Sequence, residues 1–202
     1  MDPVYLIVGL GNPGVEYEET RHNAGFLVLE RVSKRHGCVW SKDRKMQSRV
    51  ARLDFSGHKV WLSQPMTFMN LSGDAVGRLV DYYRVGINQL LIVADDADLP
   101  LGHLRLRAEG SSGGHHGLES VQLRLGLKEY ARQKIGIGRL EKSEREISNY
   151  VLGKFSDNEK RLLDQVLDRA VDQLECWMHS GIQRAMNQFN GAIGAPMPKD
   201  RE

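Results

Sequence analysis

The chain has 202 residues and a net charge of +2, with 41% hydrophobic and 27% charged residues. This balance excludes a polybasic tail protein and an acidic disordered chain, and the length suits one domain with a full core. Glycine, with 21 residues, exceeds its average share of about 7% and indicates many tight turns or close backbone contacts.

The two cysteines, Cys38 and Cys176, form neither a disulfide framework nor a metal-binding pair, although a single bridge between them stays possible. The first apolar run, residues 4–10, is too short for a signal sequence or a membrane span. We therefore expect a cytoplasmic protein that does not enter the membrane.

Apolar patterning along the chain alternates between strands and helices. Strands are predicted at 4–10, 49–55, 59–64, 90–93, 103–107 and 134–138. Helices are predicted at 21–35, 72–85 and 118–125, with a long one that begins at the capping-box pair Ser156 and Glu159 and reaches Met178. This order predicts a single α/β domain over residues 1–190, with a twisted, mixed but mostly parallel central sheet and helices on both faces. The tail, residues 191–202, is predicted to be disordered.

The first glycine-rich loop, Gly9-x-Gly11-x-x-Gly14, follows a predicted strand and matches a dinucleotide-binding fingerprint. That fingerprint needs a helix that opens at the third glycine and points its amino end at the phosphates. Here Pro13 interrupts the motif and three glutamates follow it within five residues, which would repel phosphate. A tight loop at the strand exit is the favoured alternative.

The second glycine-rich loop, residues 110–117, formally contains a nucleophile elbow with Ser112 as the nucleophile. Glycine and serine alone generate this pattern, and the downstream histidine it needs, His179, lies in the long predicted helix. The pair His115-His116 lacks the spacing of a metal site, so we expect neither a metal nor another cofactor.

Several polar residues fall where predicted strands end or a helix begins, namely Asn12, His22, Asn70 and Asp95. In an open α/β sheet such loops meet at the carboxyl edge, where ligands bind. A histidine can take a proton from water, a carboxylate can fix its tautomer, and amides can hold a carbonyl oxygen. The sequence therefore admits acyl transfer to water without a serine or cysteine nucleophile.

Seven blocks in chain order resemble the bacterial-type peptidyl-tRNA hydrolase family over nearly the whole chain. They are Val8-Gly9-Leu10-Gly11-Asn12-Pro13-Gly14, Thr20-Arg21-His22-Asn23-Ala24-Gly25, Thr67-Phe68-Met69-Asn70-Leu71-Ser72-Gly73, Asp95 with Asp98-Leu99-Pro100-Leu101-Gly102, Gly113-Gly114-His115-x-Gly117-Leu118, Ile135-Gly136-Ile137-Gly138 and Tyr150-Val151-Leu152-Gly153. The resemblance implies hydrolysis of the ester between a peptide and the 3′ ribose of tRNA, in the rescue of tRNA from stalled ribosomes, by a monomer.

The resemblance also implies roles for individual residues. His22 is expected to be the base on water, Asp95 to orient it, and Asn12 and Asn70 to stabilise the developing charge. The substrate groove is expected to involve Tyr17, Phe68, Met69, Asn70, Gly114, His115 and His116. Contacts with tRNA phosphates are expected from Arg107, Arg132 and Lys134.

The charge distribution agrees with these phosphate contacts. Residues 100–139 hold 7 basic and 3 acidic residues, a net charge of +4, whereas residues 1–99 are balanced at 12 and 12. Residues 140–202 hold 9 basic and 11 acidic residues, a net charge of −2. Phosphate contacts of this kind give affinity without reading base sequence, as a general tRNA substrate requires.

One residue departs from the family pattern: His116 stands where the family usually has asparagine. A neutral imidazole nitrogen donates or accepts a single hydrogen bond, whereas an amide does both, and imidazole also gains charge near neutral pH. Three interpretations follow: a tolerated substitute, an enzyme with lower or pH-dependent activity, or a non-hydrolytic RNA-binding relative. A serine esterase that uses Ser112 is a further alternative.

Overall fold

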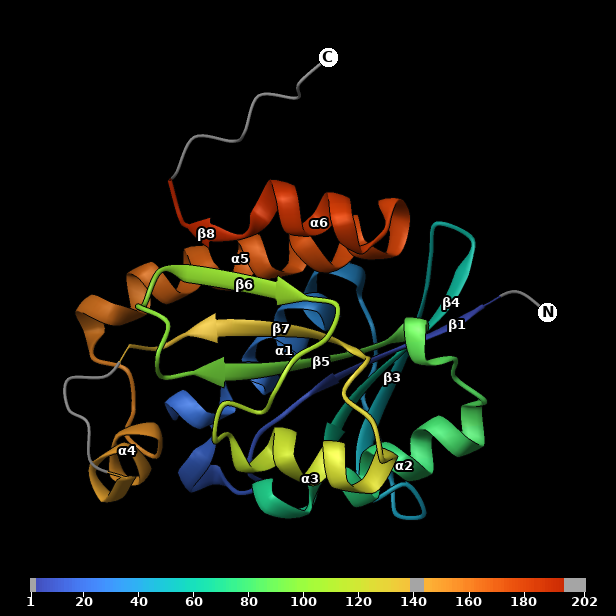
Figure 1. Cartoon of the computed structure of the whole chain (residues 1–202), viewed down its shortest axis with the longest axis horizontal. Helices are drawn as coiled ribbons and strands as arrows, with labels where there is room; N and C mark the ends of the chain where they lie inside the picture. Colours follow the sequence, from blue (N-terminus) through green and yellow to red (C-terminus); the bar gives the residue numbers. More distant parts are fainter. Residues whose placement is uncertain (1–2, 139–143, 195–202) are drawn as a thin grey trace.

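In the computed structural model, residues 3–138 and 144–194 are described, and eight strands within them form one mixed sheet (Figure 1). The strands are β1 (Val4–Gly9), β2 (Ser41–Asp43), β3 (Ser48–Phe55), β4 (His58–Pro65), β5 (Leu90–Asp96), β6 (His103–Arg107), β7 (Ala131–Gly136) and β8 (Gly191–Ala192). Their order is β2-β3-β4-β1-β5-β7-β6-β8. The central strands β4, β1, β5 and β7 run parallel, and the outer pairs are antiparallel.

Helices cover both faces of this sheet. The α-helices are α1 (Ala24–His36), α2 (Ser72–Tyr83), α3 (His116–Leu125), α4 (Glu144–Val151), α5 (Asp157–Ser180) and α6 (Ile182–Phe189). Short 3₁₀ helices are η1 (Val15–Tyr17), η2 (Arg21–Asn23), η3 (Met69–Leu71) and η4 (Ile87–Gln89). The α1 and α5 helices pack on one face, and α2 and α3 on the other (Figure 1).

Alternating side chains of the central strands divide between two cores. On β1, Ile7 packs with α1 and α5, whereas Leu6 and Val8 pack with α2 and α3. All three side chains are fully buried, as expected for a parallel strand covered on both faces. The predicted single α/β domain with a mixed sheet and helices on both faces is therefore confirmed, and the parallel strands form the centre of the sheet.

The differences from the predicted elements are local. The helix predicted from residue 21 begins at Ala24, because residues 21–23 form η2, and the strand predicted from residue 134 begins at Ala131. The short elements β2, α4 and α6 were not predicted. The tail predicted to be disordered from residue 191 starts too early, because β8 pairs with β6 at residues 191–192. Residues 195–202 of this tail lie outside the described residues.

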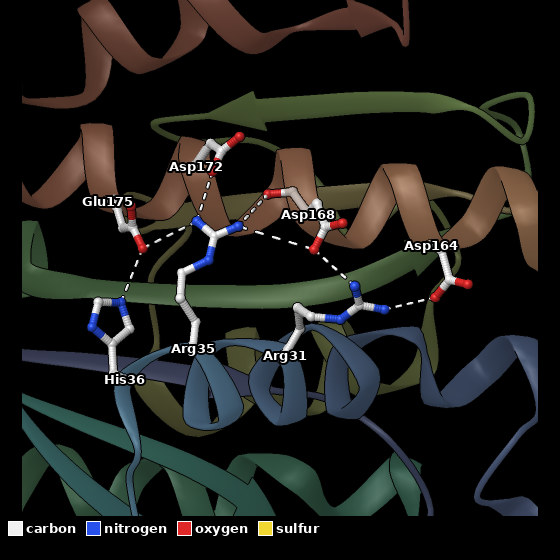
Figure 2. A network of polar contacts seen from close by, with 7 residues as sticks. All are labelled: Arg31, Arg35, His36, Asp164, Asp168, Asp172 and Glu175. Atoms are coloured by element: carbon white, nitrogen blue, oxygen red, sulfur yellow. Dashed lines mark hydrogen bonds and ion pairs between the residues drawn. The ribbon is translucent and has the colours of Figure 1, made fainter.

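Salt bridges join α1 to α5 along their exposed sides (Figure 2). Arg31 reaches Asp164 at 2.6 Å and Asp168 at 2.8 Å, and Arg35 reaches Asp172 at 2.6 Å. These ion pairs neutralise acidic side chains of α5, which contribute to the net negative charge of residues 140–202. Ion pairs this close to solvent contribute about 0–1 kcal/mol each, so the network aligns the helices more than it stabilises the fold.

Cys38 and Cys176 are free thiols. In the parts of the chain that the structure covers, no helix combines the length and apolar character that crossing a membrane requires.

Candidate active site

The first glycine-rich loop brings η2 and α1 against the carboxyl end of β1. A Cβ atom on Gly9 would collide with the carbonyl oxygen of Gly25, and one on Gly11 would lie 2.8 Å from the ring of Phe26. The chain then turns through η1 instead of opening a long helix at Gly14. These glycines therefore serve close packing of a strand exit, in agreement with the tight-loop interpretation and not with a nucleotide fingerprint.

The two residues expected to form the base meet at this edge of the sheet. His22 lies on η2 and Asp95 near the end of β5, and His22 Nδ1 donates to Asp95 Oδ1 at 2.9 Å. The His22 side chain is 12% exposed and that of Asp95 only 3%. The Asp95 carboxylate is thus shielded from water, whereas part of the His22 imidazole is accessible to solvent.

A second histidine binds the same carboxylate oxygen. His115 caps the amino end of α3, where its Nδ1 accepts from the backbone N–H groups of Gly117 at 3.1 Å and Leu118 at 3.3 Å. Because Nδ1 is an acceptor, the proton of the neutral ring sits on Nε2, which donates to Asp95 Oδ1 at 3.0 Å. His115 was expected to line the substrate groove, but the structure places it behind Asp95, as a support for the pair.

The electrostatics keep Asp95 ionised and His22 basic. Burial alone would raise the pKa of Asp95, but the charges and hydrogen bonds of His22 and His115 outweigh it and lower that pKa. Burial would likewise lower the pKa of His22, yet the charge and hydrogen bond of Asp95 raise it above its ordinary 6.5. With Nδ1–H directed to Asp95, neutral His22 presents the lone pair of Nε2 to the outside.

Interlocking backbone contacts hold Asn12 between η2 and η3, and Asn70 follows Met69 on η3. Asn12 Oδ1 accepts from the backbone N–H of Met69 at 2.8 Å, which ties the first loop to η3. Asn23, absent from the sequence-derived site, exchanges two hydrogen bonds with the Asn12 backbone, at 2.8 Å and 3.0 Å. The Asn12 oxygen is thereby occupied and its NH₂ group is left as a donor, while Asn70 is exposed on η3. The position of Asn23 one residue after His22 was the only sequence signal for its role.

The neighbouring residues Phe68 and Met69, both expected in the groove, differ in solvent exposure. Phe68 is 59% exposed, in agreement with a surface role, and Tyr17 is half-buried. Met69 is buried in the core, and a Cβ atom on Gly117 would lie 2.5 Å from its sulfur. The Met69 side chain thus fills the space between η3 and α3, and its expected part in the groove stays a prediction.

Arg132 was expected to contact phosphate, but its side chain is only 1% exposed. Its guanidinium lies 4.3 Å from the ring of Tyr130 and donates to the carbonyl oxygens of Gly110 at 2.6 Å, Ser111 at 3.2 Å and Lys128 at 2.7 Å. The expectation that Arg132 contacts phosphate is wrong, because its buried guanidinium instead binds the backbone of the second glycine-rich loop. Lys134 and Arg107 remain available, with Arg107 exposed and Lys134 paired to Asp96 at 3.1 Å.

The second glycine-rich loop is closed by Glu119. Ser112 Oγ donates to Glu119 Oε1 at 3.2 Å and accepts from the backbone N–H of Gly114 at 3.2 Å. His116, 76% exposed, lies 3.3 Å from the other oxygen of Glu119 through its Nδ1. Ser112 thus contacts a carboxylate and its own loop instead of an imidazole, which gives no support to a serine nucleophile. His116 shares a surface groove of about 680 Å³ with Asn70.

The cluster of His22, Asp95 and His115 has potential metal-ligand atoms within 4.8 Å of one another. A metal would need a lone pair from each imidazole. His115 Nδ1 is already an acceptor for two backbone N–H groups, and its Nε2 carries the proton given to Asp95. The donor set therefore suits proton transfer better than metal binding.

These features define a class of site: a buried carboxylate that holds a surface-facing histidine, with Asn12 on the adjoining loop, at the carboxyl edge of an α/β sheet. The sequence profile of the family described as peptidyl-tRNA hydrolase matches residues 6–198. The chain belongs to this family.

Relatives of known name agree in sequence and in structure. The peptidyl-tRNA hydrolase of Caldanaerobacter subterraneus subsp. tengcongensis is 44% identical over 188 residues, which cover 93% of this chain and 100% of that protein. That of Thermosynechococcus vestitus is 43% identical over 96% of this chain and 97% of its own length. The crystal structure of peptidyl-tRNA hydrolase from Acinetobacter baumannii superimposes with a TM-score of 0.88 at 38% identity, over 95% of this chain and 97% of that one.

Proposed function

We propose that the chain hydrolyses peptidyl-tRNA with a water molecule activated by His22. The activity itself follows from family membership: the chain is an ester hydrolase that acts on peptidyl-tRNA. The mechanism is carried by one observation, the 2.9 Å contact that uses His22 Nδ1 for Asp95 and leaves Nε2 free.

The proposed reaction needs one proton acceptor and no covalent intermediate. Water gives a proton to His22 Nε2 as its oxygen attacks the carbonyl carbon of the ester. Asp95 stabilises the imidazolium that forms, and the NH₂ groups of Asn12 and Asn70 donate to the oxygen that gains charge. When the bond to the 3′ oxygen breaks, the imidazolium returns its proton to that oxygen, releasing tRNA and a peptide with a free carboxyl group.

The tRNA arm of the substrate is proposed to lie over β6 and β7. Arg107 on β6 is exposed, and Lys134 on β7 lies beneath the second glycine-rich loop, 3.5 Å from the position of a Cβ atom on Gly113. Lys134 would exchange Asp96 for a phosphate when tRNA binds. Contacts of this kind bind the tRNA backbone without recognising its base sequence. We also propose that the protein works as a monomer in the cytoplasm.

The buried histidine–carboxylate pair disfavours the alternative of a non-hydrolytic RNA-binding relative. An RNA-binding module has no need for a nearly fully buried carboxylate that two histidines share. Burying such a charge is costly unless it is compensated by partners of this kind. The retained pair therefore supports the hydrolytic proposal.

The test is single-turnover hydrolysis of peptidyl-tRNA by wild type, His22→Ala and His36→Ala. His22→Ala is expected to lose about 10²- to 10⁴-fold in rate, the usual contribution of a general base. His36→Ala removes another histidine that contacts a carboxylate at 2.9 Å and is expected to keep the wild-type rate within about twofold. A His22→Ala variant as fast as wild type would overturn the mechanism, and an inactive wild type would overturn the function.

A further inference from the structure

The residue that precedes the proposed base is a buried cation. The Arg21 side chain is 11% exposed, and its Nη2 lies 3.1 Å and 3.0 Å from the two carboxylate oxygens of Glu159, at the start of α5. Burial alone would raise the pKa of Glu159, but hydrogen bonds from Ser156 and Arg21 and the charge of Arg21 lower it. Arg21 and Glu159 therefore form a partly desolvated ion pair beside His22, where such contacts are stronger than at the surface.

The segment between α4 and α5 also surrounds Arg21 with rings and backbone. Its guanidinium lies 4.3 Å from the ring centre of Tyr150 and 5.3 Å from that of Phe155. The backbone N–H of Arg21 donates to the carbonyl oxygen of Gly153 at 3.0 Å. A Cβ atom on Gly153 would lie 3.0 Å from Arg21 Nη1, so glycine leaves room for the guanidinium. The side chain is thus held in one orientation.

Tyr150 links this cation indirectly, through Ile137, to the strand that carries Asp95. Its hydroxyl group donates to the carbonyl oxygen of Ile137 at 2.8 Å. The backbone N–H of Ile137 in turn donates to the carbonyl oxygen of Asp96 at 3.1 Å, next to Asp95. The Tyr150 side chain therefore contacts Arg21 in the turn that carries His22 and Ile137 just after β7, and Ile137 in turn bonds to Asp96, the neighbour of Asp95.

We propose that Arg21, with Tyr150 and Glu159, is a positioning device that holds His22 at hydrogen-bonding distance from Asp95. The η2 helix is only three residues long and has no side-chain cap, so it needs support from outside. Cation–π contacts and charge-assisted hydrogen bonds supply that support in a site shielded from water. The inference rests on the proposed role of His22 as the base.

The test variant is Arg21→Lys, which keeps the charge near His22 and loses the planar group that stacks on Tyr150 and contacts Glu159. The kcat is expected to fall about tenfold with KM within about twofold, because small misplacements of a reacting group are costly. In ¹⁵N NMR spectra the pKa of His22 is expected to fall toward its ordinary value as contact with Asp95 loosens. The neighbouring ring of His115, 4.9 Å from that of His22 between ring centres, is not altered by this substitution.

Two companions make the result interpretable. Arg31→Lys makes the same change in an ion pair from α1 to α5 (Figure 2) and is expected to leave kcat and the pKa of His22 unchanged. Tyr150→Phe keeps the ring and removes only its bond to Ile137, so it serves if Arg21→Lys does not fold. It is expected to lower kcat and the pKa of His22 in the same direction by a smaller factor.

A folded Arg21→Lys or Tyr150→Phe protein with unchanged kcat and unchanged His22 titration would overturn the proposal and leave the cluster as a structural contact. The two proposals fail separately. Full activity in His22→Ala would remove the base, whereas the NMR titration of His22 reports the positioning effect without any substrate.

Discussion

Two histidine–carboxylate pairs in this molecule have the same contact distance and different surroundings. His22 meets Asp95, and His36 meets Glu175, each at 2.9 Å. The first pair is 12% and 3% exposed, and the second is 23% and 26% exposed on the outer side of α1 and α5 (Figure 2). Distance alone therefore does not distinguish a base from a surface ion pair.

The partners of each carboxylate make the difference. Asp95 receives a second proton donor, His115, whose tautomer is fixed by the backbone of α3. Glu175 is shared with Arg35, a permanent cation that competes with His36 for the same oxygen. His115 donates to Asp95 through Nε2 while its Nδ1 stays an acceptor, so, unlike Arg35, it adds a hydrogen bond and not a permanent cation beside the carboxylate.

The largest expected effect tests the buried carboxylate. Asp95→Asn is expected to lower kcat/KM by about 10²- to 10⁴-fold, because the amide lacks the charge that stabilises the imidazolium. The base must be neutral to act, and Asp95 raises the pKa of His22, so wild-type kcat/KM should rise with pH through a midpoint above 6.5. The residual activity of Asp95→Asn should show a lower midpoint. Glu175→Gln is the matched exposed control, and an unmoved midpoint in Asp95→Asn would contradict this account.

A smaller effect separates two basic residues on the same strand. Lys134→Ala is expected to raise KM several-fold at low salt and to reduce the slope of log KM against log salt by about one, with kcat unchanged. Arg132→Met should leave that slope unchanged and lower the free energy of unfolding by about 1–3 kcal/mol, because it orphans the carbonyl groups of Gly110 and Lys128. If Arg132→Met reduced the salt slope and Lys134→Ala did not, the assignment of the two residues would be reversed.

The smallest effect concerns His116, which stands where the family usually has asparagine. Since this side chain is exposed and contacts only Glu119 among the described residues, His116→Asn is expected to hydrolyse peptidyl-tRNA at least as fast as wild type. Steady-state rates on one substrate check this. A loss beyond about tenfold, the scale of a removed catalytic contact, would show that His116 has a chemical role of its own.

The fold and the contact between His22 and Asp95 could be predicted from the sequence, for identifiable physical reasons. Apolar alternation on buried strands and the capping box of α5 are local signals, and both appear in the structure as predicted. His22 and Asp95 could be brought together because parallel neighbours β1 and β5 end at one edge of the sheet. The strands β2 and β8 carry too few residues for a periodic pattern. The helix α6 does place Ile182, Ala185, Met186 and Phe189 at helical spacing, a signal that was present in the sequence and that the prediction missed.

Burial of individual polar side chains could not be predicted in the same way. Arg132 and Lys134 lie two residues apart on β7 and so share a face of the strand. Arg132 donates to the carbonyl groups of Gly110 and Ser111 in the second glycine-rich loop, whereas Lys134 pairs with Asp96, and these contacts separate the two residues. His115 and His116 are adjacent, but His115 is the N-cap of α3 and bonds to Asp95, whereas His116 is the first residue of the helix and is exposed. Such differences depend on contacts between segments distant in sequence.

The most direct test of the central claim is a ¹⁵N NMR titration of His22 in the wild-type protein. The account predicts that the neutral ring carries its proton on Nδ1 and that its pKa lies above 6.5. A neutral ring protonated on Nε2, or a pKa below 6.5, would contradict the account, because Nε2 would then have no lone pair for water or Asp95 would not support the base.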